Sequence, residues 1–176
     1  MAWPAHIPQY CSEEEFLALP EGPDRIELID GEVIVSPSPL PLHQVVVGRL
    51  YVALQAWAAE HPPAFVGLSP LDVRLGTDRI VQPDLFVVRG GVDPRRIVDT
   101  VPDLVVEVLS GNRAYDRLAK RALYEEAGVG EYWIADPDAR RIEQVTGGRI
   151  LAATDRLRAA ALDGVEVDVE AVFAGL

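Results

Sequence analysis

The chain has 176 residues, with 16 basic against 28 acidic side chains, and therefore a formal net charge of −12. This length suits one domain with its own core, which we expect to span residues 1–176, and the 49% hydrophobic content excludes intrinsic disorder. The single cysteine, Cys11, excludes a disulfide framework within one chain. Signal-peptide features are absent, and no apolar run reaches the roughly 18–20 residues of a membrane helix, so we expect a soluble cytoplasmic protein.

The first third of the chain predicts a short helix, a hairpin and a long helix. Ser12 and Glu15 have the spacing of a capping box, which marks a helix start. Asp30-Gly31 is a dipeptide favoured in tight β-hairpins. The pattern predicts a helix from residue 13 to about residue 19, a hairpin over 25–35, an extended proline-rich loop over 36–41 and a helix over 43–61.

The rest of the chain alternates strands with one further helix. Three apolar stretches of strand length come first, over residues 65–75, 79–88 and 104–109. A helix over 114–127, a strand over 131–135, a hairpin turning at 147–148 and an edge strand after residue 163 complete the pattern. The central order of helix, three strands, helix and strand indicates a mixed α/β layered fold with hairpins added at both ends.

Two carboxylates interrupt apolar strands. Glu107 lies in a continuous apolar run that predicts a strand covered on both faces, and Asp84 lies between two apolar segments. Pro83 removes a backbone donor, so we expect an edge or a bulge beside Asp84. A buried carboxylate loses its hydration, at a cost of several kcal/mol, unless another group pairs with it or coordinates it. In one interpretation, each acid pairs with a buried arginine or faces water near the end of its strand. In the other, both acids converge on a site for Mg²⁺ or Mn²⁺, and we adopt this as the functional hypothesis.

Lys120 is the only lysine among 16 basic residues. It lies on the helix that follows the Glu107 strand, which makes it the best candidate for a catalytic cation. The alternative is a surface pair with Asp116, four residues earlier, worth about 0.3–0.5 kcal/mol. The high net negative charge argues against non-specific nucleic-acid binding, so a nucleic-acid function needs a local basic patch, for which the candidates are Arg113, Arg117 and Arg121.

Two further polar residues are candidates for the same site. His43 follows the proline-rich loop at the first turn of the long helix, from which it could reach the edge of a sheet. Glu27 and Glu32 flank the turn of the predicted hairpin, so one of them could point at the same site, and the alternative is that both lie on solvated faces. No glycine-rich phosphate loop and no serine-hydrolase elbow is present in the sequence.

Taken in order, these motifs resemble the Uma group of predicted restriction endonucleases, in the PD-(D/E)XK nuclease superfamily. The resemblance covers roughly residues 12–140, and its motifs include QPDLFVV around Asp84, LVVEVLS around Glu107, YDRLAK ending at Lys120 and GVGEYWIADP after it. The superfamily core is helix, three strands, helix and strand, in agreement with the order above. The resemblance implies a restriction-endonuclease-like mixed sheet and a nuclease acting on DNA.

The resemblance also implies roles for particular residues. Asp84 and Glu107 would bind the metal, Mg²⁺ or Mn²⁺, and we expect the backbone carbonyl of Val108 to complete the protein ligands. The superfamily pattern has a lysine two residues after the glutamate, but in this chain that position is Leu109. In families of this type, a lysine from the following helix is thought to fill the same space. Lys120 matches that lysine. Glu27 and His43 match further polar positions of the group.

The sequence leaves three functions open. In the first, a Mg²⁺-dependent endonuclease cuts both strands of DNA, and because this needs two active sites, we expect a homodimer. In the second, suggested by the acidity and by Leu109, the chain is a catalytically inactive interaction or regulatory module that kept the fold. In the third, it is a metal-dependent hydrolase of a smaller phosphate ester, which a closed pocket would favour and a basic, duplex-wide groove would oppose.

Overall fold

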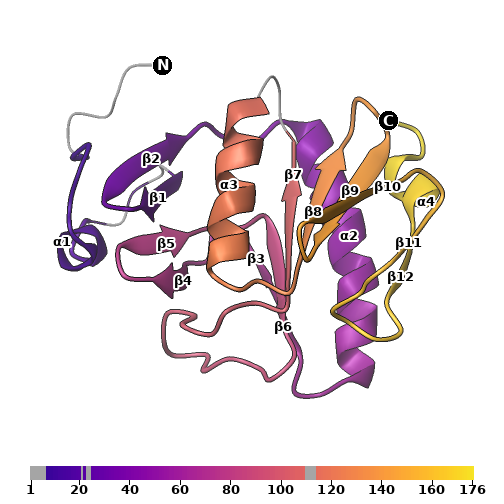
Figure 1. Ribbon diagram of the computed structural model, residues 1–176, viewed down its shortest axis with the longest axis horizontal. Helices are drawn as coiled ribbons and strands as arrows, with labels where there is room; N and C mark the ends of the chain where they lie inside the picture. Colours follow the sequence, from indigo (N-terminus) through magenta and orange to yellow (C-terminus); the bar gives the residue numbers. More distant parts are fainter. Residues whose placement is uncertain (1–6, 21, 23–24, 110–113) are drawn as a thin grey trace.

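The computed structural model describes residues 7–20, 22, 25–109 and 114–176 and, of residues 114–118, only the backbone. Two sheets and four helices organise these residues, together with a small two-stranded sheet (Figure 1). The helices are α1 (Glu13–Leu17), α2 (Pro41–Glu60), α3 (Ala114–Glu126) and α4 (Val169–Phe173). The strands are β1 (Arg25–Ile29), β2 (Glu32–Ser36), β3 (Phe65–Leu68), β4 (Val73–Gly76), β5 (Arg79–Val81), β6 (Leu85–Val88), β7 (Leu104–Val108), β8 (Glu131–Asp136), β9 (Arg141–Thr146), β10 (Arg149–Ala153), β11 (Arg156–Arg158) and β12 (Glu166–Asp168).

The six-stranded sheet forms the centre of the fold, in the order β10-β9-β8-β7-β6-β3. All its pairs are antiparallel except β7 and β8, which run parallel and are joined through α3. Helix α2 covers one face and helix α3 the other (Figure 1). The predicted mixed α/β core of α2, β3, β6, β7, α3 and β8 is therefore confirmed, and the β9–β10 hairpin extends this same sheet.

The four-stranded sheet, in the order β2-β1-β5-β4, lies beside the central sheet and carries the N-terminal hairpin. The β1–β2 turn places Asp30 at φ 54° and Gly31 at φ 83°, the left-handed pair that a two-residue hairpin of type I′ requires. Helix α1 has the predicted capping box, in which Ser12 accepts a hydrogen bond from the Glu15 amide and the Glu15 side chain accepts one from the Ser12 amide. The helix ends at Leu17, two residues earlier than predicted.

Two predicted strands are each divided between the sheets. The stretch over 65–75 forms β3 and β4, separated by the Ser69-Pro70 peptide, and the stretch over 79–88 forms β5 and β6, separated at residues 82–84. Both breaks contain a proline, which cannot donate to a strand ladder. The prediction that Asp84 lies in an edge or bulged strand was wrong, because Asp84 lies between β5 and an interior strand, β6.

The C-terminal tail also differs from its prediction. Only 166–168 form a strand, β12, which pairs with β11 rather than with the edge of the central sheet. Helix α4 begins directly after it, because the Asp168 side chain accepts a hydrogen bond from the Ala171 amide at 2.9 Å and so caps the helix. The helix was missed because alternating valines dominated the sequence pattern. No described helix has the length and apolar character needed to cross a membrane.

Candidate active site

The candidate site lies where β6 begins and β7 ends. Because these strands are antiparallel neighbours, the residue before β6 lies beside the last residues of β7. The Val108 amide donates a hydrogen bond to Asp84 Oδ2 at 2.8 Å, which fixes Asp84 against the end of β7. Asp84 is 3% exposed and Glu107 8% exposed, so both acids are buried.

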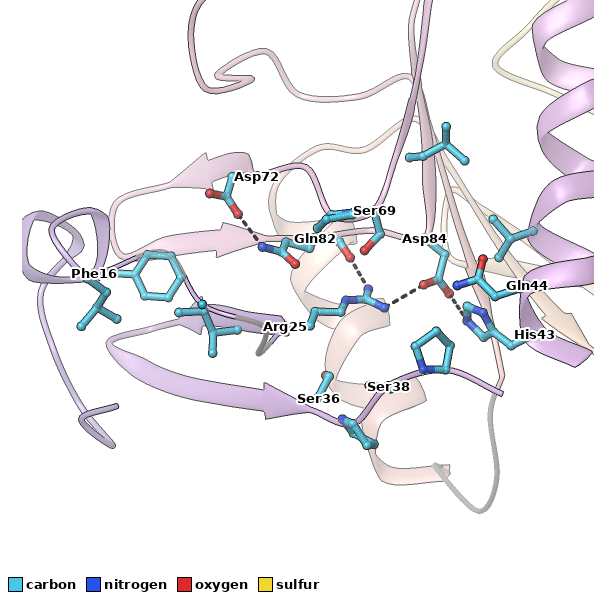
Figure 2. Close-up of a pocket in the computed structure, with 18 of the residues that line it drawn as sticks. Phe16, Arg25, Ser36, Ser38, His43, Gln44, Ser69, Asp72, Gln82 and Asp84 are labelled. Carbon is cyan, nitrogen blue, oxygen red and sulfur yellow. Dashed lines mark hydrogen bonds and ion pairs between the residues drawn. The ribbon is translucent and has the colours of Figure 1, made fainter. Parts of the chain in front are cut away.

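Asp84 is held by one arginine and one histidine (Figure 2). Arg25 Nη1, at the start of β1, donates to Asp84 Oδ1 at 2.9 Å, and the second terminal nitrogen of Arg25 bonds the backbone carbonyl of Gln82. His43 Nε2, in the first turn of α2, lies 2.9 Å from Asp84 Oδ2. Burial alone would raise the pKa of Asp84, but the hydrogen bond from His43, the Arg25 charge and the Val108 amide together hold that pKa well below its usual range.

Glu107 extends toward α3. Its Oε1 accepts hydrogen bonds from Lys120 Nζ at 2.8 Å and from the Tyr124 hydroxyl at 2.8 Å. Lys120 and Tyr124 are four residues apart and so present their side chains from one face of the helix. Burial raises the pKa of Glu107 to about 7; the charge of Lys120 opposes the rise, and the charges of Asp84 and Glu27 add to it.

Glu27 joins the same cluster from the middle of β1. Its side chain is fully buried, accepts the Gln82 amide at 2.8 Å and places both carboxylate oxygens 3.1 Å from Lys120 Nζ. Burial disfavours the Lys120 ammonium, but Glu107 and Glu27 more than offset this and raise the pKa of Lys120 above its ordinary value. Lys120 therefore stays protonated between two carboxylates.

The cluster has more acids than permanent cations. Asp84, Glu107 and Glu27 face Arg25 and Lys120, and the charges of the other two acids add to the effect of burial, which is the main cause of the raised pKa of Glu107. Several buried polar atoms here also accept or donate no hydrogen bond within the described residues: Arg25 Nε, His43 Nδ1 and Gln82 Oε1. Such atoms are rare in native interiors, and their concentration at one place is typical of a functional site.

The type and charge of the donors suit a hard divalent cation. Among the described residues, no three histidine, cysteine or acidic side chains converge into a ready metal group. Two carboxylates with a backbone carbonyl and waters are nevertheless the ligands that Mg²⁺ uses, and the excess negative charge of the cluster favours a cation. As the side chains stand, Arg25 occupies Asp84 Oδ1 and Lys120 occupies Glu107 Oε1, so a metal would have to share or displace these contacts.

All five side chains that the sequence marked as candidates meet here: Asp84, Glu107, Lys120, Glu27 and His43. Their catalytic and metal-binding roles, and that of Val108, stay predictions. Leu109 packs in the core on the α3 side, and its amide donates to the Ala135 carbonyl.

The predicted basic patch is not supported at Arg121, the member of it whose side chain the structure describes. The Arg121 guanidinium bonds Glu125 at 3.2 Å and the Gly148 carbonyl at 3.2 Å, which directs it to the β9–β10 turn. The side chains of Arg113 and Arg117 lie outside the described part of the chain.

Two contributors were missed from the sequence. Arg25 lies two residues before Glu27 and so shares its face of β1, and Tyr124 lies one helical turn after Lys120. Both spacings are readable in the sequence and could have identified these residues once Glu27 and Lys120 were chosen.

A pocket of about 850 Å³ opens beside Asp84. Arg25 crosses its middle, Asp84 and His43 lie to one side, and Phe16 and Asp72 lie to the other (Figure 2). Ser36 and Ser38, from the end of β2 and the loop after it, face Ser69 across the pocket. Glu27, Glu107 and Lys120 are not among its described lining residues, so the pocket reaches the cluster from the Asp84 side.

Comparisons with known proteins identify the fold and the family. The chain is similar to a solved structure described as a putative nuclease belonging to DUF820 from Anabaena variabilis ATCC 29413, with 20% sequence identity and a TM-score of 0.79. That match covers 93% of this chain and 97% of the other, and at this identity it establishes the fold. No match is found among curated proteins. The protein-family model Uma2, described as "Putative restriction endonuclease", matches residues 13–171. The chain belongs to the Uma2 family of restriction endonuclease-like proteins.

Proposed function

We propose that this chain is a metal-dependent endonuclease that hydrolyses phosphodiester bonds of DNA. The family and the fold are those of nucleases, which supports the reaction class. The observation that carries the proposal further is the contact of Lys120 Nζ with Glu107 at 2.8 Å, beside Asp84 at the end of the same strand pair. This contact supports the inference that Lys120 supplies the cation that Leu109 cannot.

The residues of the cluster would divide the work between them. Asp84, Glu107 and the Val108 carbonyl would hold the metal, which when bound polarises the scissile phosphate and lowers the pKa of a bound water. Lys120, which stays protonated, would donate to the phosphate as negative charge develops on it. His43 would keep Asp84 oriented, and Tyr124 and Glu27 would fix the positions of Glu107 and Lys120.

The test compares wild type with Glu107→Ala and Lys120→Met in two measurements. We expect Glu107→Ala to lose both Mn²⁺ binding in isothermal titration and cleavage of plasmid DNA. Lys120→Met should keep Mn²⁺ binding but cut about 10²–10³-fold more slowly, the usual effect of removing one group that stabilises transition-state charge. Glu60→Gln, an exposed carboxylate at the end of α2, is the matched control. Cleavage unaffected by Glu107→Ala or by Asp84→Ala would overturn the assignment.

A second candidate is a catalytically inactive interaction or regulatory module. The observation that favours it is that Asp84 is ion-paired with Arg25 at 2.9 Å and Glu107 with Lys120 at 2.8 Å, which is the state expected of acids that bind no metal. This module predicts neither Mn²⁺ binding nor cleavage by the wild type. Either activity, lost in Glu107→Ala, would exclude it.

We also propose that the protein forms a homodimer if it cuts both strands of a duplex. The outer edge of β10 is not paired with another described strand and exposes Ile150 and Leu151, which supports a role in association. Light scattering on the purified chain tests this. A strictly monomeric species at the concentrations of the cleavage assay would contradict it.

A further inference from the structure

The pocket beside Asp84 has the size of a single small ligand. Its volume of about 850 Å³ lies within the range of about 300–1,000 Å³ that encloses one drug-sized molecule. A DNA duplex is too wide to enter a pocket of this volume, because its major groove alone is about 12 Å across. The pocket could therefore take one or a few nucleotides of a strand, but not a paired helix.

The charge of the pocket points the same way. Among its described lining residues, Arg25 is the sole arginine or lysine, and Asp72 and Asp84 are acidic. Neutralisation of phosphates by lysine and arginine supplies much of the affinity for any DNA, but this contribution is smaller for a single strand than for a duplex, and this chain has a net charge of −12. The pocket thus offers one phosphate position, at the Arg25 guanidinium, directly beside Asp84.

The walls suit the faces and edges of an unpaired base. Leu17 on α1 and Leu68 at the end of β3 both line the pocket and remain 48% and 38% exposed. Such apolar side chains can cover base faces, and the serine hydroxyls at 36, 38 and 69 can bond base or sugar edges. In a duplex these faces and edges would already be stacked and paired.

The pocket is continuous with the catalytic cluster. Leu68 pairs with Leu85, the residue that follows Asp84, and the Ser69 amide donates to the Asp84 carbonyl at 3.3 Å. A strand lying against Leu68 and Ser69 would thus pass beside Arg25 and Asp84.

We propose that this pocket binds an unpaired DNA strand and that the substrate is a single-stranded or frayed segment rather than continuous duplex. The inference rests on the proposed nuclease function and names its substrate class. Because each cut in an unpaired strand needs one active site, the inference does not depend on the homodimer.

The test measures binding and cleavage of one labelled sequence in three forms: single strand, blunt duplex and duplex with an unpaired overhang. We expect wild type to bind the single strand and the overhang about tenfold more tightly than the blunt duplex, and Leu68→Glu or Leu17→Glu to remove that preference, as the loss of one stacked base would. Both side chains are exposed, so the fold should persist, which circular dichroism verifies. Val52→Glu on α2, at an apolar side chain that is 67% exposed and does not line the pocket, is the matched control.

The two proposals fail in different ways. If wild type binds and cuts blunt duplex as well as single strand, and Leu68→Glu changes neither, the pocket proposal is overturned, although loss of cleavage in Glu107→Ala would still support the nuclease. If no DNA form is cut, but single-strand binding is strong and weakened by Leu68→Glu, the pocket proposal stands and the nuclease fails.

Discussion

Two buried glutamates on neighbouring parallel strands have opposite surroundings. Glu131 begins β8 opposite Leu104, and Glu107 lies near the end of β7, so the two carboxylates mark opposite ends of the central sheet. Glu131 is 1% exposed and Glu107 8% exposed. Burial is therefore nearly the same for both, and the difference lies in their partners.

Glu131 is saturated by neutral donors. Its carboxylate accepts hydrogen bonds from the Trp133 indole, the Gln144 amide group and the backbone amides of Ala160 and Ala161, the last two at 2.6 and 2.7 Å. These bonds connect the loop before β12 to the sheet. No cation and no second acid take part in them, and Glu131 is accordingly a structural residue.

Glu107 is balanced by a cation that it shares with Glu27, and Asp84 lies close enough to repel its charge. A carboxylate held in this way can exchange partners, because a cation can take the place of Lys120 beside Glu107 while Lys120 keeps Glu27 or pairs with another anion. The comparison separates the two acids by their partners rather than by their burial, and shared cations with unbonded polar atoms nearby are the features typical of a functional site.

The largest expected effect on stability is at the structural acid. Glu131→Ala leaves four hydrogen-bond donors without this acceptor, of which the Trp133 indole and the Gln144 side chain are buried, and we expect the free energy of unfolding to fall by about 3–5 kcal/mol. Glu107→Ala should cost less, because Lys120 keeps Glu27 as its partner. Urea unfolding followed by tryptophan fluorescence measures both. If Glu131→Ala lowered the free energy of unfolding no more than Glu107→Ala does, the distinction between a structural and a functional carboxylate would be contradicted.

A second prediction concerns pH. Between pH 4.5 and about 7 the native Glu107 keeps a proton that the unfolded chain has released, so wild type should lose stability as the pH rises through this window. At about 1.4 kcal/mol per pH unit, Glu107→Gln, which cannot ionise, should gain up to about 3 kcal/mol relative to wild type by pH 8. The pKa of Asp84 is shifted in the opposite direction, and this shift changes the stability with pH only below the ordinary Asp pKa of 3.8.

Urea titrations at several pH values check this prediction, with Glu60→Gln as the control for loss of an exposed carboxylate. The difference between wild type and the control should stay constant with pH. A difference between wild type and Glu107→Gln that is also constant would mean that Glu107 is ionised throughout this range.

The sequence predicted the central sheet because its strands are continuous apolar runs bounded by glycine and proline. It also marked five side chains that meet in the candidate site, since carboxylates within buried strands and a single lysine stand out against their neighbours. It did not divide 65–75 and 79–88 between two sheets, because apolar content is the same on both sides of Pro70 and Pro83. Strand order depends on long-range pairing that local patterns do not encode.

The partners of the site acids were harder to predict than the acids themselves. Arg25 and Asp84 are 59 residues apart and meet only because β1 pairs with β5, directly before residues 82–84. The same long-range pairing explains why Glu131 was not recognised as structural: its donors come from positions 133, 144, 160 and 161.

The smallest effect we predict is at Tyr124, where a substitution tests whether hydrogen bonds to Glu107 change the pKa of that carboxyl group. Burial, with the charge of Glu107 close by, raises the pKa of Tyr124 well above its ordinary value, so its hydroxyl stays a donor. Tyr124→Phe removes the 2.8 Å bond to Glu107 and should lower the free energy of unfolding by about 1 kcal/mol.

A hydrogen bond to a carboxylate favours its ionised form, so its loss should raise the pKa of Glu107 further. The acid limb of the cleavage profile should then move to higher pH. Tyr51→Phe, on α2 at the opposite face of the sheet, is the control. A loss of stability without movement of that limb would make Tyr124 a packing residue only.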